Sequence, residues 1–255
     1  MSTTPSVLAE ANYRALREQP PNVAVLPWGA TEAHNDHLPF GTDVIEAEGI
    51  ARLAVEQANK SGAQALMLPV IPFGNNAQQL DQIATIHLST ATALSLLRDI
   101  ARSLKTQGID RLIIANAHGG NTFSPIVRDL IQETGVLIVV AHVFRLAPQV
   151  YDATFERDGG HADEMETSVM LHLRPDLVHL DQAGPGERVP FAIDGLERPG
   201  VWTPRPWSRC HPDTGAGDPS LATAQKGAVF TTAMVDALAE LITAVGAAKP
   251  GDNPL

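Results

Sequence analysis

The chain has few of the residues that mark several common classes of protein. It has one cysteine, Cys210, in 255 residues, which excludes an internal disulfide framework and a four-thiolate zinc site. No run of about eighteen apolar residues is available to span a bilayer, and no N-terminal segment joins a basic patch to an apolar stretch. We therefore expect a cytoplasmic protein without a membrane partner.

Positive charge is also scarce. The chain has 18 Lys and Arg residues against 29 Asp and Glu residues, a formal net charge of -11, and its basic residues do not cluster. Nucleic acids and anionic membranes attract basic surfaces. The composition therefore argues against a nucleic-acid partner and favours a small molecule.

Apolar segments with helical spacing alternate with short segments rich in branched residues. The helical segments are 8–19, 44–59, 89–107 and 220–245, and the strand-like segments are 23–27, 65–70, 111–116 and 136–143. This alternation predicts a single α/β domain over residues 1–255, with a mainly parallel sheet covered on both faces. We expect residues 184–219, which are dense in Pro and Gly, to form a long ordered loop, and residues 247–255 to be frayed.

Polar clusters follow three of the predicted strands, and the first of them has the composition of a metal site. Residues 32–43 contain three carboxylates and two imidazoles, and both groups are common metal ligands. Glu32 and His34 are two residues apart, so in an extended segment their side chains point to the same side. Ligands of parallel sheets gather at the carboxyl ends of the strands, which is where this cluster is predicted to lie.

Two further clusters carry candidate ligands. Residues 116–121, Asn-Ala-His-Gly-Gly-Asn, follow the third predicted strand, and the two glycines beside His118 let the backbone approach a ligand closely. Residues 161–167 are expected to open a helix. On a helix His161 and Glu164, three residues apart, would share a face and could address one centre.

These stretches resemble the creatininase family of metal-dependent hydrolases. The matching residues are 29–34 with 37–39 and 41–43, then 116–121, then 161–162 with 166–168, and they follow the family's order over nearly the whole chain. The resemblance implies a three-layer α/β/α fold, assembly as a homohexamer, and two divalent metal ions per subunit.

Position by position, the resemblance implies four metal ligands. Glu32 and His118 would hold one ion, His34 would hold the second, and Asp43 would bridge the two. Carboxylate and imidazole ligands suit Zn²⁺, Mn²⁺ or Fe²⁺, so the sequence leaves the metal open among these three.

The second ion needs one more ligand. In creatininase a glutamate two residues after the matching histidine completes the second site, but here that position is Gly120. Glu164 is the candidate replacement, on the expectation that it faces the cleft together with His161. The resemblance implies that His161 is the catalytic histidine, which hands a proton to the leaving nitrogen, and that Glu166 orients His161 or touches the substrate.

The activity implied is hydrolysis of a non-peptide amide C–N bond, in a cyclic amide or a formamide, by water that the metal ions activate. Two alternatives remain open, a peptidase-like maturation enzyme acting on a small peptide and a non-catalytic binding relative. Creatininase covers creatinine with tryptophans near the loop before His161, but residues 151–160 contain none. Creatinine is therefore not the expected substrate, and Tyr151, Phe155 and Trp202 are candidates to shape a different pocket.

Overall fold

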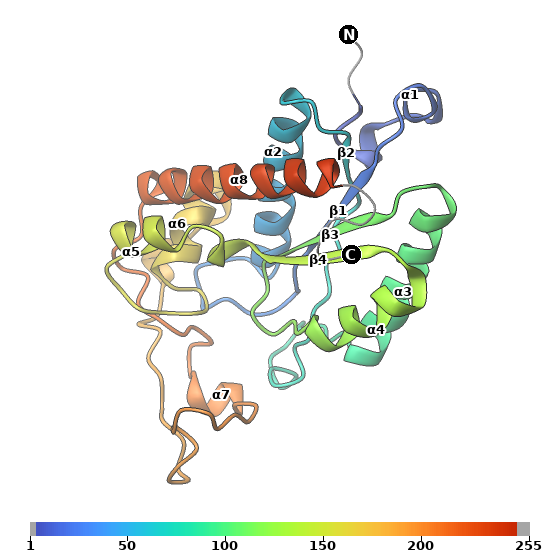
Figure 1. The fold of residues 1–255 in the computed structure, drawn as a ribbon. Helices are drawn as coiled ribbons and strands as arrows, with labels where there is room; N and C mark the ends of the chain where they lie inside the picture. Colours follow the sequence, from blue (N-terminus) through green and yellow to red (C-terminus); the bar gives the residue numbers. More distant parts are fainter. Residues whose placement is uncertain (1–3, 249–255) are drawn as a thin grey trace.

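The computed structural model describes residues 4–248 and builds them around a four-stranded parallel sheet (Figure 1). The strands are β1 (Val23–Trp28), β2 (Ala65–Met67), β3 (Arg111–Asn116) and β4 (Leu137–His142), in the order β2-β1-β3-β4. The predicted parallel sheet is confirmed. Most of the segment predicted to be frayed lies outside the described residues.

Helices cover both faces of the sheet, which confirms the three-layer α/β/α architecture. On one face α2 (Thr42–Lys60), α6 (Glu164–Leu173) and α8 (Ala224–Ala247) share a core with Val23 and Val25 of β1. On the other face α3 (Thr90–Thr106) and α4 (Ser124–Thr134) share a core with the alternate residues Ala24 and Leu26. The side chains of one strand therefore serve two cores, as the two-residue period of a strand requires.

Helix α8 is more apolar than the sequence analysis recognised. Its 24 residues include a window of mean hydropathy 1.6, and it is the one helix within residues 4–248 that is long and apolar enough to cross a membrane. In the fold Phe230, Met234, Leu238 and Ile242 recur at helical spacing and are buried in the core that α8 shares with α2 and the sheet. The packing of these residues in the core accounts for the apolar composition of α8.

Several predicted element bounds differ from the structure, and two of these differences have a plain local cause. The helix predicted over residues 8–19 is divided into a 3₁₀ turn, η1 (Leu8–Glu10), and a short helix, α1 (Tyr13–Glu18). The division falls at Asn12, whose extended backbone and side-chain oxygen, 3.0 Å from the Ala15 amide, start a new helix. The strand predicted over 65–70 ends at Met67, two residues before Pro69, which has no N–H to give to a ladder.

The remaining elements are short and lie in the connections. They are η2 (Val143–Arg145), α5 (Pro148–Thr154), η3 (Pro175–Leu177), η4 (Leu180–Gln182) and α7 (Trp207–Cys210). Helix α7 belongs to the predicted loop 184–219, which extends from the body of the molecule at the lower left of Figure 1. The loop prediction is confirmed except for this one helical turn.

Candidate metal centre

The carboxyl ends of β1 and β3 bring the predicted ligands together. Glu32 and His34 follow β1, His118 follows β3, and Asp43 lies in the first turn of α2; all four are buried. Gly29 makes the close approach of α2 possible, because a Cβ there would lie 2.7 Å from the backbone of Asp43. Only glycine fits between the end of β1 and the start of α2.

The first group of ligand atoms comes from Glu32, Asp43 and His118, whose candidate atoms all lie within 4.8 Å of one another. The His118 Nδ1 atom is 2.7 Å from Glu32 Oε1 and 2.9 Å from Asp43 Oδ2. On its other side His118 Nε2 is 3.3 Å from the carbonyl oxygen of Asn75. If Nε2 donates to that oxygen, the lone pair of Nδ1 points at two carboxylates, as in a metal-binding histidine.

The second group comes from His34, Asp43 and Glu166. His34 Nε2 is 2.9 Å from Asp43 Oδ1 and 4.0 Å from Glu166 Oε2, and its ring is oriented by a 3.1 Å contact between Nδ1 and the Glu32 carbonyl. Both groups use Asp43, each through a different carboxylate oxygen. Asp43 therefore has the position of a bridging ligand.

His161 forms a third group with Glu32 and His34. Its ring centroid is 4.2 Å from that of His34, and its Nδ1 atom is 4.0 Å from Glu32 Oε1. The other nitrogen, Nε2, lies 2.7 Å from the carbonyl oxygen of Ala33 and can donate to it. The free nitrogen of His161 therefore faces the same centre as the candidate ligands Glu32 and His34.

Buried carboxylate oxygens at this centre lack hydrogen-bond partners. Both oxygens of Glu32 and Oδ2 of Asp43 are buried and accept no hydrogen bond. An uncompensated buried carboxylate is costly, and pairing with a cation removes most of that cost. The donor set therefore fits divalent metal ions.

The pKa shifts at this centre come from burial and from the charges that are packed together there. Burial lowers the pKa of His34, but attraction to Asp43 and then Glu166 prevails and raises it to about 10. Burial raises the pKa of Glu166 to about 8, with Asp163 and Asp43 adding repulsion. The pKa of His161 falls to about 4, through burial and the charge on His34. The raised pKa of His34 therefore reflects its carboxylate neighbours, while the lowered pKa of His161 reflects burial beside a positive charge.

The predicted role of Glu164 needs correction. Helix α6 begins at Glu164 and is capped by Asp163, whose side chain accepts the N–H of Glu166. His161 therefore precedes the helix, and Ala162, which follows it, has a left-handed backbone with φ +50°. The three-residue helical spacing does not apply to His161 and Glu164.

The Glu164 carboxylate points away from the ligand cluster. Its Oε2 atom accepts the backbone N–H groups of Glu156 at 3.0 Å and Arg157 at 2.9 Å, and its Oε1 atom pairs with the ammonium of Lys226. Glu166, two residues further along α6, is the carboxylate that reaches His34. The structure thus brings together six of the seven predicted site residues and leaves out Glu164.

Gly120 explains why no ligand comes from its position. A Cβ at Gly120 would lie 2.5 Å from the Asn75 carbonyl oxygen and 2.5 Å from His118 Nε2. The backbone at Gly120 is packed against the contact that orients His118, so a side chain has no room there.

Two buried residues beside the site were missed. Glu46 lies one helical turn after Asp43 and is fully buried with neither oxygen hydrogen-bonded, and burial followed by repulsion from Glu166 raises its pKa well above the usual range. Helical spacing from Asp43 could have identified it. Trp207, in the loop 184–219, packs edge to face on His161 with ring centroids 5.3 Å apart. No local pattern places Trp207 there.

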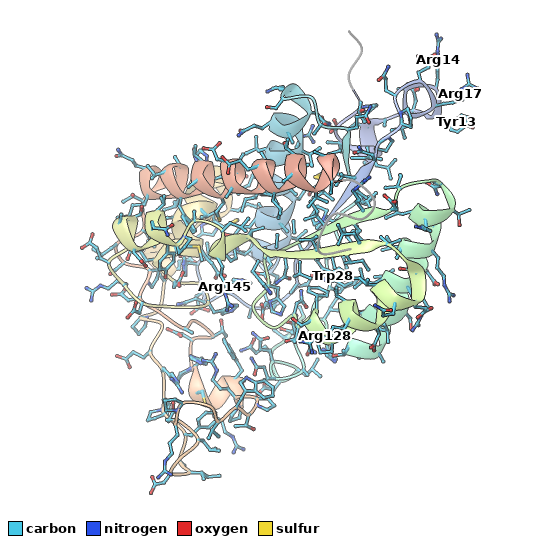
Figure 2. All side chains as sticks on the ribbon, viewed as in Figure 1. Tyr13, Arg14, Arg17, Trp28, Arg128 and Arg145 are labelled. Carbon is cyan, nitrogen blue, oxygen red and sulfur yellow. The ribbon has the colours of Figure 1, made fainter. Side chains whose placement is uncertain are left out.

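The expected pocket aromatics lie elsewhere. Tyr151 and Phe155 pack on Phe230 of α8, with ring centroids 5.7 and 5.3 Å away, and Trp202 is 84% exposed. Tyr151 and Phe155 therefore pack in the hydrophobic core. Trp28 also packs as a core residue, between the sheet and α4 (Figure 2), with its ring against Phe123.

Comparison with known families and relatives points to one group of hydrolases. The family model named Creatininase, described as creatinine amidohydrolase, matches residues 8–242. A mycofactocin precursor peptide peptidase of Mycobacterium tuberculosis is 32% identical over 237 residues, which cover 90% of this chain and 87% of the relative. A creatinine amidohydrolase of Pseudomonas putida is 29% identical over 180 residues, which cover 63% of this chain and 67% of the relative.

Solved structures share the fold. A candidate creatinine amidohydrolase of Bacteroides fragilis has a TM-score of 0.89 at 38% identity and covers 96% of this chain and 97% of its own. A creatininase described with manganese has a TM-score of 0.79 at 23% identity, with 96% of this chain and 100% of that chain covered. At that identity the second likeness concerns the fold alone.

Proposed function

The chain belongs to the creatininase family, and from this premise we propose that it hydrolyses an amide C–N bond with two divalent metal ions bound. The observation that carries the proposal is the shared carboxylate of Asp43. One of its oxygens lies beside His34 and the other beside His118, each 2.9 Å away. Two groups of ligands that share one carboxylate are suited to a pair of ions.

We assign Glu32, Asp43 and His118 to one ion and His34, Asp43 and Glu166 to the other. Glu166 thereby takes the ligand role expected of Glu164. Zn²⁺, Mn²⁺ and Fe²⁺ all suit these ligands. When bound, such ions polarise a carbonyl group and lower the pKa of water.

His161 is the proposed proton carrier. Its Nε2–H group donates to the Ala33 carbonyl, which orients the ring and leaves Nδ1 to take up a proton and deliver it to the leaving nitrogen. The alternative role for His161 is a metal ligand, because Nδ1 also lies within reach of Glu32 and His34. Metal content and turnover of a His161 variant separate the two roles.

For the substrate we propose a small molecule with a non-peptide amide bond, a cyclic amide or a formamide. A short peptide is the second candidate, and one observation favours it: mycofactocin precursor peptide peptidases are 30 to 32% identical to this chain and match over 83 to 93% of it. Both candidates require the same ions and the same proton transfer.

The experiment reconstitutes the demetallated protein with Zn²⁺, Mn²⁺ or Fe²⁺ and measures metal by elemental analysis. The loaded protein is then offered cyclic ureides, lactams, formamides and short peptides, with products detected by mass, and Glu32→Ala serves as the inactive control. Two ions per chain and a hydrolysed amide support the proposal. A folded protein that takes up no divalent ion refutes it.

The homohexamer and the cytoplasmic location stay predictions. Sedimentation of the metal-loaded protein measures the first, and fractionation of cells that express it measures the second.

A further inference from the structure

Arg205 differs from the other cations that have no acidic partner. Within residues 4–248 no carboxylate oxygen lies within 4.0 Å of its guanidinium group, although its side chain is partly buried. The other lysines and arginines of this part of the chain that form no such ion pair are all exposed: Arg17, Lys60, Lys105, Arg128, Arg145, Arg198 and Arg209. Figure 2 shows Arg17 at the corner of the molecule opposite the loop 184–219. A partly desolvated cation without a counter-ion would be stabilised by a bound anion.

The guanidinium group of Arg205 is held in place by neutral groups. Its central carbon lies 4.8 Å from the ring centroid of Trp207, and its Nη1 atom is 3.0 Å from Nε2 of the buried His211. The Arg205 backbone N–H donates to Gln78 Oε1 at 3.1 Å. A cation fixed by an aromatic face and a neutral imidazole keeps further N–H donors for a ligand.

Trp207 connects this group to the proposed metal centre. Its ring meets the ring of His161 edge to face, with an interplanar angle of 88°. It is 5% exposed, and its indole N–H donates to the Thr214 carbonyl at 2.9 Å. The next residue, Ser208, donates to Asp81 of the loop after β2. Arg205 and the proposed proton carrier therefore both contact the same indole ring.

We propose that Arg205, supported by Trp207 and His211, binds a carboxylate group of the substrate beside the scissile amide bond. This inference rests on the proposed function and deepens it, because it limits the substrate to amides that carry an acid. Burial, followed by the charge of Arg188, lowers the pKa of Arg205, and the negative charge of a bound carboxylate would act in the opposite direction. In a chain of net charge -11 such a site must be local, because the surface as a whole repels anions.

Matched probes test the proposal without knowledge of the substrate. N-formylglycine and N-formylglycinamide differ only in the carboxylate, and so do trialanine and its C-terminal amide. Dissociation constants are measured by calorimetry for the metal-loaded and the demetallated protein. We expect the acid of at least one pair to bind about 10- to 100-fold more tightly than its amide, which is typical of charge-assisted hydrogen bonds. A preference in the formyl pair indicates a small acid, and a preference in the peptide pair indicates a peptide C-terminus.

The variants Arg205→Met and Arg205→Lys are compared with Arg209→Met, which removes an exposed arginine of the same loop. We expect Arg205→Met to abolish the preference, Arg205→Lys to reduce it and Arg209→Met to keep it, with unchanged circular dichroism and metal content in all three. Carboxylates also bind metal ions directly. A preference that survives Arg205→Met, or that disappears with the metal, overturns the subsite, and so does the absence of any preference in the wild-type protein. Because metal content is measured separately, these outcomes leave the proposed function standing.

Discussion

The cluster of candidate ligands is built from two parts of the molecule that hold their side chains by different means. Glu32, His34 and His118 lie on the segments that leave β1 and β3, whereas His161 and Glu166 lie on either side of the start of α6. In the first part the last residues of the two strands, Trp28 and Asn116, are paired in register. The sheet therefore places both segments side by side before any side chain is considered.

The second part depends on contacts with distant segments. The His161 carbonyl accepts the N–H of Ala216 at 2.8 Å, and the Ala216 carbonyl accepts the N–H groups of Gly160 and His161. These bonds join the segment before α6 to the loop 184–219, whose Trp207 covers the ring of His161. The side chains at the strand ends therefore follow from the local pattern, while those at the start of α6 follow from long-range packing.

The largest effect is expected at the residue shared by both groups of ligands. Asp43→Asn keeps the shape of the side chain but removes the charge that would bridge the ions, so both ions and all turnover should be lost. Elemental analysis measures the metal, with Glu48→Gln, an exposed residue of the same helix, as control. If Asp43→Asn retains both ions, the bridging role is wrong.

The next effect separates the two parts of the site. His161→Ala should lower kcat by about 10²- to 10⁴-fold, the usual contribution of a general acid or base, and should leave the metal content unchanged. Exposed His172 of α6 offers the control His172→Ala. Loss of metal from His161→Ala would instead make His161 a ligand.

A pair of variants on α6 compares its two neighbouring carboxylates. Glu166→Gln should weaken the binding of one ion by more than about 10-fold, because even the partners of metal ligands commonly contribute that much, and should leave the other ion in place. Titration with a competing chelator measures both affinities. If Glu166→Gln binds two ions as tightly as the wild type, Glu166 is not a ligand.

Glu164→Gln is the counterpart and should act on stability. Glu164 is fully buried and pairs with Lys226 and two backbone N–H groups, so loss of its charge should lower the free energy of unfolding by about 2 kcal/mol. Denaturant unfolding of the metal-free protein measures this change. Metal affinity should stay as in the wild type, and a selective loss of one ion would contradict the correction made for Glu164.

A single added methyl group tests the packing of the backbone beside His118. Gly120→Ala forces a Cβ against Asn75 and His118 and should lower the free energy of unfolding by about 1 to 3 kcal/mol. Gly119→Ala is the control, because a Cβ there meets nothing within 4 Å. Equal thermal stability of the two variants would show that the backbone at Gly120 can move aside.

The same division explains which features of the molecule could be predicted from the sequence and which could not. The four strands were located within a few residues. Short runs of apolar, branched residues between polar clusters are typical of buried strands and too short for most helices. The start of α6 was placed three residues too early, since the pattern of residues 161–167 does not reveal that Asp163 caps the helix. Because of that error Glu164 was predicted to face the candidate ligands, a position that Glu166 has in the structure.

By itself the sequence determined the parallel sheet, the two covered faces and the position of Glu32, His34 and His118 after strand ends, because periodicity and the rule for carboxyl ends of strands act over short segments. Tertiary structure alone decided that Glu166 rather than Glu164 faces His34, that Trp207 packs on His161 and that Arg205 lies over the ring of Trp207. The physical reason is that hydrogen bonds and ion pairs between residues far apart in the chain fix those side chains, and no local pattern encodes which distant partner a side chain will meet.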